Sequence, residues 1–214
     1  MAAAGAEAVH VHARGPDGLE ALDADSCGSV VAAVRSGCPG LPVGLTTGAW
    51  IEPDPERRLA WIRGWHDADL PDFCSVNFSE AGAADLCVAL LERGMGVEAG
   101  LATVADARTL VASGLAGRCL RVLVEPQEED PGAATRTAPA VEAELAAGGV
   151  EVPLVVHGQG AAAWPVLRFA LERGHDLRIG LEDTLAGPDG SPARDNEQLV
   201  AEARRMIEAY SSSG

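Results

Sequence analysis

The chain has 214 residues, of which 47% are hydrophobic and 22% charged, and its formal net charge is -16. This length suffices to bury one sizeable core. The excess of acidic residues argues against nucleic acid and membranes as partners, because anionic phosphates are bound by clustered basic side chains. No apolar run approaches the roughly 18 residues that span a bilayer, and the first residues lack the features of a signal peptide, so we expect a globular, cytoplasmic protein.

All 16 basic residues are arginine. The absence of lysine excludes Schiff-base chemistry, which requires a lysine amine. Any carbonyl chemistry must therefore stabilise negative charge with a metal ion, arginine or backbone donors. The five cysteines form no Cys-x-x-Cys pair, and their odd number and irregular spacing predict reduced thiols that are buried as small apolar residues.

Apolar runs of strand length alternate with helix-like segments along the whole chain. Strands are predicted at residues 8–13, 42–46, 73–77, 96–101, 120–125, 153–157 and 177–181. Helices are predicted at residues 26–36, 56–65, 81–93, 104–113, 138–147, 162–173 and 196–210, with N-terminal caps at Asp54, Ser79, Thr103 and Asp195. This alternation predicts successive βα units and a parallel sheet.

Two observations favour a closed (β/α)₈ barrel over an open doubly wound sheet. No Gly-x-Gly-x-x-Gly or Walker-type loop follows any strand, so an open nucleotide-binding sheet lacks its phosphate-binding loop. Polar side chains follow almost every strand, and barrel enzymes build their sites at the C-terminal ends of several strands. We therefore predict an α/β fold of the TIM (β/α)₈ type, N-terminally incomplete because about seven parallel strands are found where a barrel has eight.

The polar residues at the predicted strand ends contain a candidate metal site. His10 and His12 lie two residues apart on a strand and share one face, while Glu182 and Asp183 follow another strand, four and five residues after Arg178. Two imidazoles and one carboxylate are typical ligands of an open catalytic zinc site. The alternatives are a hydrogen-bonded histidine pair and an Arg–Glu ion pair with a capping aspartate.

Other polar residues at strand ends are candidates for substrate contacts. The hydroxyl and amide groups of Thr46, Thr47, Ser75 and Asn77 suit a substrate carboxylate or carbonyl, although each also suits a turn or cap. For other side chains the sequence allows only general expectations. Glu98 and Glu125 end strands and need partners if buried, and His157 either joins the site or lies in a plain βα turn. We expect Arg57 and Arg58 to form a solvated helix face and the tryptophans to serve packing.

Several short motifs of the chain, taken together, resemble those of a known family. The runs His10–Arg14, Thr46–Gly48, Ser75–Asn77, Val97–Gly100 and Arg178–Asp183 together resemble the β-keto acid cleavage enzymes, the family of the 3-keto-5-aminohexanoate cleavage enzyme. The resemblance implies a zinc-dependent TIM barrel that converts a β-keto acid and acetyl-CoA into acetoacetate and a new acyl-CoA.

The resemblance also assigns roles to individual residues. The family's metal ligands fall on His10, His12 and Glu182, and its deprotonating triad of hydroxyl, arginine and aspartate falls on Thr46, Arg178 and Asp183. Ser75, Asn77 and Glu98 match substrate-contacting positions, and we add Arg14, Thr47 and His157 to the substrate-binding set.

Two departures from the family pattern stand out. Threonine occupies position 46 where some members carry serine, which keeps the hydroxyl but narrows the pocket. The family's first strand and most of its first helix, including a substrate-binding glutamate, have no counterpart, so residues 1–214 are expected to form one incomplete TIM-barrel-like domain. We expect a homo-oligomer. The alternatives are a metal-binding barrel remnant without catalysis and a different zinc-dependent barrel hydrolase or lyase.

Overall fold

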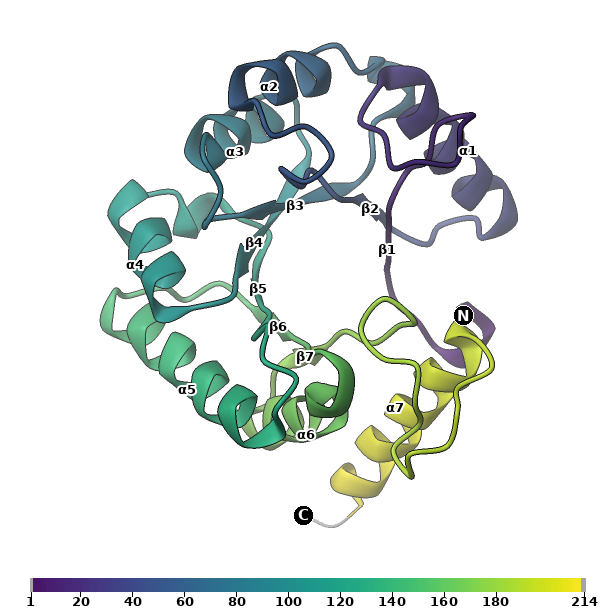
Figure 1. The fold of residues 1–214 in the computed structure, drawn as a ribbon, viewed down its shortest axis with the longest axis vertical. Coiled ribbons are helices and arrows are strands. Elements are labelled where there is room, and N and C mark those ends of the chain that lie inside the picture. The colour runs from purple at the N-terminus through teal and green to yellow at the C-terminus, as the bar shows by residue number, and fades with distance from the viewer. Residues whose placement is uncertain (1, 213–214) are drawn as a thin grey trace. The chain divides into compact units, whose positions relative to one another are not determined.

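The computed structural model describes residues 2–212 and shows alternating strands and helices (Figure 1). The strands are β1 (Val9–Val11), β2 (Val43–Leu45), β3 (Phe73–Asn77), β4 (Gly96–Leu101), β5 (Arg121–Val124), β6 (Leu154–Val156) and β7 (Asp176–Leu177). The α-helices are α1 (Ala24–Gly37), α2 (Pro55–Arg63), α3 (Ala83–Glu92), α4 (Val104–Ser113), α5 (Pro131–Ala147), α6 (Ala163–Arg173) and α7 (Asn196–Ser211). Short 3₁₀ turns lie at Ala2–Ala4, Asp67–Asp69, Ala116–Arg118 and Gly160–Ala162.

The strand order in the sheet follows the chain, from β1 to β7. The described residues divide into two compact units, one of residues 2–6, 101–108 and 122–212, and one of residues 7–100 and 109–121. We call them the C-terminal unit and the N-terminal unit. In the N-terminal unit β1, β2, β3 and β4 pair in parallel, and in the C-terminal unit β5, β6 and β7 do so. The parallel βα organisation predicted from the sequence is confirmed.

Helix boundaries follow local capping chemistry. Asp54 accepts hydrogen bonds from the first backbone N–H groups of α2 and precedes Pro55, and Asp195 caps α7 through the N–H of Gln198. Ser79, in contrast, does not cap α3, which begins after Gly82. The predicted start of α5 was also wrong, because Asp130 and the following proline begin that helix at Pro131.

The last strand is shorter than predicted. β7 ends at Leu177, and the chain then turns, with the backbone N–H groups of Asp183 and Thr184 both donating to the carbonyl of Gly180 at 3.0 Å. The side-chain alternation of a strand therefore does not apply beyond Arg178. The polar run that follows is displayed by a turn instead.

Buried strand residues and buried helix residues together form the core of each unit. In the C-terminal unit, for example, Trp164 and Leu167 of α6 form a buried cluster with Leu199 and Ala203 of α7. Four of the five cysteines are buried, Cys38 is half-buried and all five are free thiols, as predicted. Among the described helices, none has the length and apolarity required to cross a membrane.

Candidate metal centre and active site

His10 in β1 and His12, directly after the end of this strand, bring their rings together, as the spacing predicted. The rings of His10 and His12 meet edge to face, with centroids 5.3 Å apart and an interplanar angle of 79°. Both side chains are half-buried. Two imidazoles in this arrangement can each offer one ring nitrogen to a common ligand on their side of the strand.

A carboxylate that the sequence analysis missed contacts the second histidine. Glu20 Oε1 lies 3.0 Å from Nδ1 of His12, and Glu20 Oε2 accepts a hydrogen bond of 2.6 Å from the indole N–H of Trp50. Although desolvation, the largest effect, raises the pKa of Glu20, the contacts with Trp50, His12 and Arg14 outweigh it, so the pKa lies below its usual value. The carboxylate is therefore held as an anion beside the imidazole.

A tight chain reversal after β1 brings Glu20 to this position. Gly18 has a φ of +80°, which favours glycine, and its N–H donates to the carbonyl of Gly15. Arg14 and Glu20 then pair across an antiparallel bridge. The sequence signal was the Pro16-Asp17-Gly18 turn, which predicts that the chain folds back on β1.

Trp50 is not a packing residue of the core, in contrast to the prediction for the tryptophans. It is 58% exposed, and its ring lies 5.8 Å from that of His12. A Cβ added to Gly48 would meet the indole at 2.1 Å, so this glycine makes room for the ring. The indole is thus fixed in an exposed position next to a candidate metal ligand.

A second cluster of charged groups is buried in the C-terminal unit. Nδ1 of His157 lies 2.9 Å from Asp183 Oδ1, and its Nε2 lies 3.4 Å from Glu125 Oε2. His157 is 1% exposed and Asp183 3%. His157 therefore belongs to a buried charge cluster and is not a residue of a plain βα turn.

Arg178 completes this cluster. Its guanidinium lies 2.7 Å from Glu182 and 3.5 Å from Asp183. Burial, the largest effect, lowers its pKa, but Asp183 and Glu182 outweigh that effect and the pKa of Arg178 lies above its ordinary value. Burial and Arg178 also lower the pKa of His157, yet the contacts with Asp183 and Glu125 leave it raised overall. A buried carboxylate between an imidazole and a guanidinium is suited to receive and release a proton.

Backbone contacts fix the position of Asp183. Its carbonyl accepts a hydrogen bond of 2.8 Å from the N–H of Gly160 in the turn after β6. Asn196, the first residue of α7, accepts one of 2.7 Å from the N–H of Leu181. The turn at residues 180–184 is therefore anchored both to the preceding βα loop and to the last helix.

The hydroxyl residues after β2 lie in buried surroundings. Thr46 is 3% exposed, and its Oγ1 accepts a hydrogen bond of 3.3 Å from the N–H of Gly48. The hydroxyl of Thr47 donates to the carbonyl of Ser75 at 2.6 Å, which joins the end of β2 to β3. Ser75 itself is 7% exposed.

Asn77 is oriented by a buried ion pair that the sequence analysis did not predict. Glu80 accepts hydrogen bonds from Asn77 Nδ2 at 3.0 Å and from Arg58 Nη1 at 2.7 Å. Glu80 also accepts one from the backbone N–H of Ala49 at 3.0 Å. Arg58 is 1% exposed, so the expectation of a solvated helix face is wrong for this residue, because its position in α2 directs it toward the loop after β3.

Glu98 has the partner that its burial requires. It lies within β4, not at its end, and Oε1 is 2.5 Å from the guanidinium of Arg121. Arg121 in turn lies over the ring of Phe73, 5.1 Å from its centroid. Oε2 of Glu98 is buried and makes no hydrogen bond within the described residues.

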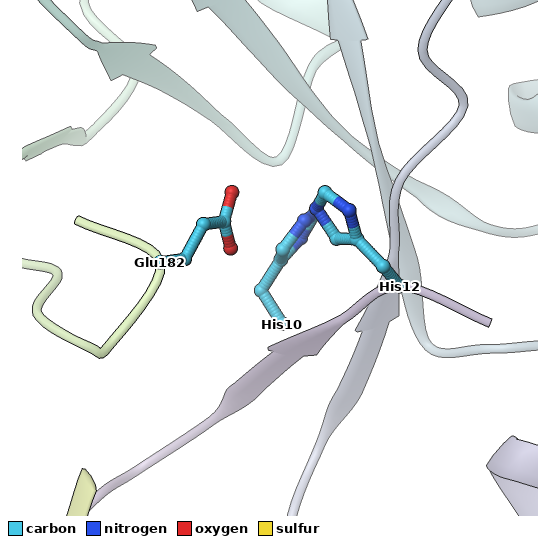
Figure 2. Close-up of side chains that lie close together, drawn as sticks. All are labelled: His10, His12 and Glu182. Carbon is cyan, nitrogen blue, oxygen red and sulfur yellow. The ribbon is translucent and has the colours of Figure 1, made fainter. Parts of the chain in front are cut away.

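The side chains proposed as metal ligands come from both units. Figure 2 draws these side chains, which are His10 and His12 of the N-terminal unit and Glu182 of the C-terminal unit. The donor set of two imidazoles and one carboxylate is that of open catalytic zinc sites. The carboxylate on Nδ1 of His12 is the usual companion of a metal-binding histidine.

Comparison with solved structures identifies the fold. The apo structure of ObcA is similar to this chain with a TM-score of 0.73 and 18% sequence identity, and the match covers 98% of this chain and 59% of that one. ObcA in a ternary complex with a C4-CoA adduct and oxalate matches with the same TM-score at 17% identity, covering 98% and 61%. A 3-dehydroquinate dehydratase from Geobacillus kaustophilus HTA426 has a TM-score of 0.53 at 14% identity, over 89% of this chain and 76% of that one.

These likenesses, together with the parallel βα order, confirm an α/β fold of the TIM-barrel type, with seven strands in the described residues. The chain spans about 60% of the length of ObcA. A search among curated proteins found no match.

The family assignment comes from the sequence as a whole. The family described as beta-keto acid cleavage enzyme matches residues 1–213, which is nearly the entire chain. The resemblance that the short motifs suggested is thereby confirmed, and the chain belongs to the family of beta-keto acid cleavage enzymes.

Proposed function

We propose that this chain is a zinc-dependent enzyme that converts a β-keto acid and acetyl-CoA into acetoacetate and a new acyl-CoA. The single observation that carries the proposal is the buried cluster of Asp183, His157 and Arg178 in a member of this family. A carboxylate 3% exposed between an imidazole and a guanidinium is an arrangement for moving protons.

His10, His12 and Glu182 would hold the zinc ion. The donor set fits zinc, and the edge-to-face rings on β1 and the carboxylate on Nδ1 of His12 support this assignment. When bound, zinc supplies Lewis acidity that polarises the ketone of the β-keto acid and stabilises its enolate. A chain without lysine has no amine for Schiff-base activation, so a Lewis acid is the alternative it requires.

Asp183 would act as the base that removes the α-proton of the β-keto acid. The guanidinium of Arg178, 3.5 Å away, orients this carboxylate, and it contacts Glu182 at 2.7 Å. Nδ1 of His157 lies 2.9 Å from Oδ1 of Asp183, the oxygen that also faces Arg178, and can exchange a proton with this carboxylate. Thr46 would supply the hydroxyl of the family's triad.

The bond changes then balance without a further reactant. The α-carbanion attacks the thioester carbonyl of acetyl-CoA, a C–C bond forms and the thiolate of CoA leaves. The thiolate attacks the original ketone, the bond between that carbon and the α-carbon breaks, and the electron pair remains on the acetoacetate carbanion. The proton held by Asp183 returns to this carbanion.

The remaining predicted residues would bind the two substrates. Ser75 and Asn77 offer a hydroxyl and an amide oxygen, and Glu80 fixes the orientation of the latter. Thr47 and Glu98 would act mainly by shaping the pocket, since each is engaged within the protein. The side chain of Arg14 is 61% exposed and would attract the phosphates of CoA on an otherwise acidic protein.

Solved complexes of ObcA support this class of substrate. ObcA has been determined with oxaloacetate, whose keto group lies β to a carboxylate, and with a C4-CoA adduct and oxalate. A β-keto acid and a CoA derivative are the two reactants proposed here.

The test uses the full chain loaded with zinc, acetyl-CoA and a panel of β-keto acids that differ in side-chain charge and size. We expect acetoacetate and the matching acyl-CoA from at least one substrate, detected by mass spectrometry. Asp183→Asn should lower kcat about 10²- to 10⁴-fold, the usual contribution of a general base. Asp189→Asn, at an exposed position, is the matched control and should retain activity. Zinc-loaded protein that forms no acyl-CoA from any substrate would refute the proposal.

A further inference from the structure

We propose that Glu20 is a positioning residue of the metal centre, which fixes the tautomer and the ring orientation of His12, and that Trp50 holds Glu20 in place. This inference rests on the proposed function, because it takes His12 as a metal ligand. It concerns two residues to which neither the family resemblance nor the predicted site gave a role.

The chemistry of the imidazole explains the role of Glu20. A carboxylate only accepts hydrogen bonds, so its 3.0 Å contact with Nδ1 of His12 is a hydrogen bond only when Nδ1 carries the proton. In a neutral ring the lone pair is then on Nε2, which is the nitrogen left to bind a metal ion. A carboxylate behind the ring also increases the basicity of the coordinating nitrogen.

Glu20 is itself fixed through its second oxygen. Oε2 accepts the indole N–H of Trp50 at 2.6 Å, while Oε1 faces His12 and lies 3.9 Å from Arg14. The carboxylate can therefore not rotate without breaking one of two short contacts. A glutamate without such a second partner would exchange between rotamers and orient the imidazole less well.

The exposed position of Trp50 is consistent with this role. The indole is 58% exposed, so burial of its apolar surface contributes little to hold it. Three contacts nevertheless define the position of the indole. They are the hydrogen bond to Glu20, the contact with the ring of His12 at 5.8 Å and the close approach to Gly48. A large aromatic side chain that is fixed but not buried is better explained by the position of its N–H than by packing.

The experiment measures zinc affinity of the apo chain by competition with a chromophoric chelator. Glu20→Ala should weaken zinc binding about 10- to 100-fold, the usual effect of losing the partner of a metal-binding histidine. Glu20→Gln should lose less, because its amide oxygen can still accept from Nδ1, and Trp50→Phe should also lose less than Glu20→Ala. Glu92→Gln, an exposed glutamate in α3, removes the same charge without touching the cluster and should leave the affinity unchanged. Melting of the apo variants reports any general loss of structure separately.

The ¹⁵N shifts of His12 in the zinc-loaded chain provide a measurement that depends on no Glu20 variant. We expect a protonated Nδ1 and a metal-bound Nε2, and a metal-bound Nδ1 would overturn the inference. Wild-type zinc affinity in Glu20→Ala would overturn it as well, while leaving the proposed function intact. Equal zinc binding by the wild type and His10→Ala would instead contradict the proposed function.

Discussion

The buried ion pair between Arg58 and Glu80 allows a quantitative prediction. Arg58 is 1% exposed and donates to Glu80 at 2.7 Å and to the carbonyl of Ala81 at 2.6 Å. In Glu80→Gln the oxygen that faces Asn77 can remain, but an amide N–H₂ replaces the oxygen that faces Arg58. Two donors then oppose each other, and the guanidinium is left buried without its counter-charge. We expect a loss of about 3–5 kcal/mol in the free energy of unfolding.

The measurement is urea unfolding of the wild type, Arg58→Met, Glu80→Gln and the double variant, with the free energies compared in a double-mutant cycle. The double variant should lose about 2 kcal/mol less than the sum of the single variants, because removal of both charges avoids the unpaired guanidinium. Arg57→Met is the matched control, since this neighbour forms an ion pair with Glu52 but its side chain is 65% exposed, and we expect a loss of only about 0–1 kcal/mol. A loss below 1 kcal/mol for Glu80→Gln, or strictly additive variants, would refute the reasoning.

Three further predictions concern single side chains. The pKa of His157 is raised in the folded protein. Its contribution to stability is therefore complete below the pKa of a histidine in the unfolded chain, about 6.5, and is lost as the pH rises through the higher folded-state pKa. The urea midpoints of the wild type and His157→Gln should converge at alkaline pH, and parallel pH profiles would contradict this. Gly48→Ala should displace Trp50, whose indole lies 2.1 Å from the added Cβ, and shift its fluorescence, with an unchanged spectrum as the contrary result. Burial raises the pKa of the Cys27 thiol to about 12, so iodoacetamide at pH 8 should label the half-buried Cys38 in the native protein and Cys27 only after unfolding, as mass spectrometry can check.

The fold could be predicted from the sequence because its local signals agree with one another. Apolar runs, capping residues such as Asp54 and Asp195, and terminal glycines all point to the same βα alternation, and the strands and helices follow it closely. One error concerns the start of α5. The prediction placed it at residue 138, whereas Asp130 provides the actual cap and the helix continues through Pro139.

The candidate site was predictable only for residues in recognisable motifs. The shared face of His10 and His12 follows from strand geometry, and the structure agrees. Glu20, in contrast, reaches His12 through a chain reversal, and Arg58 reaches Glu80 over a sequence separation of 22 residues. Such contacts depend on tertiary packing, and a lone glutamate or an Arg-Arg pair in a helix carries no periodic signal that would reveal them.

Three arginines with little exposed side chain face carboxylates, and this has a consequence for the chain's response to pH. Arg58, Arg121 and Arg178 are each at most 22% exposed at their side chains and each faces a carboxylate. Lysine in their place could discharge in alkali, but arginine remains protonated throughout the range that proteins tolerate. Base therefore leaves the ion pairs of these three arginines intact, whereas acid separates them by protonating the carboxylates. The positive half of each pair is a permanent charge around which the surrounding loops are organised.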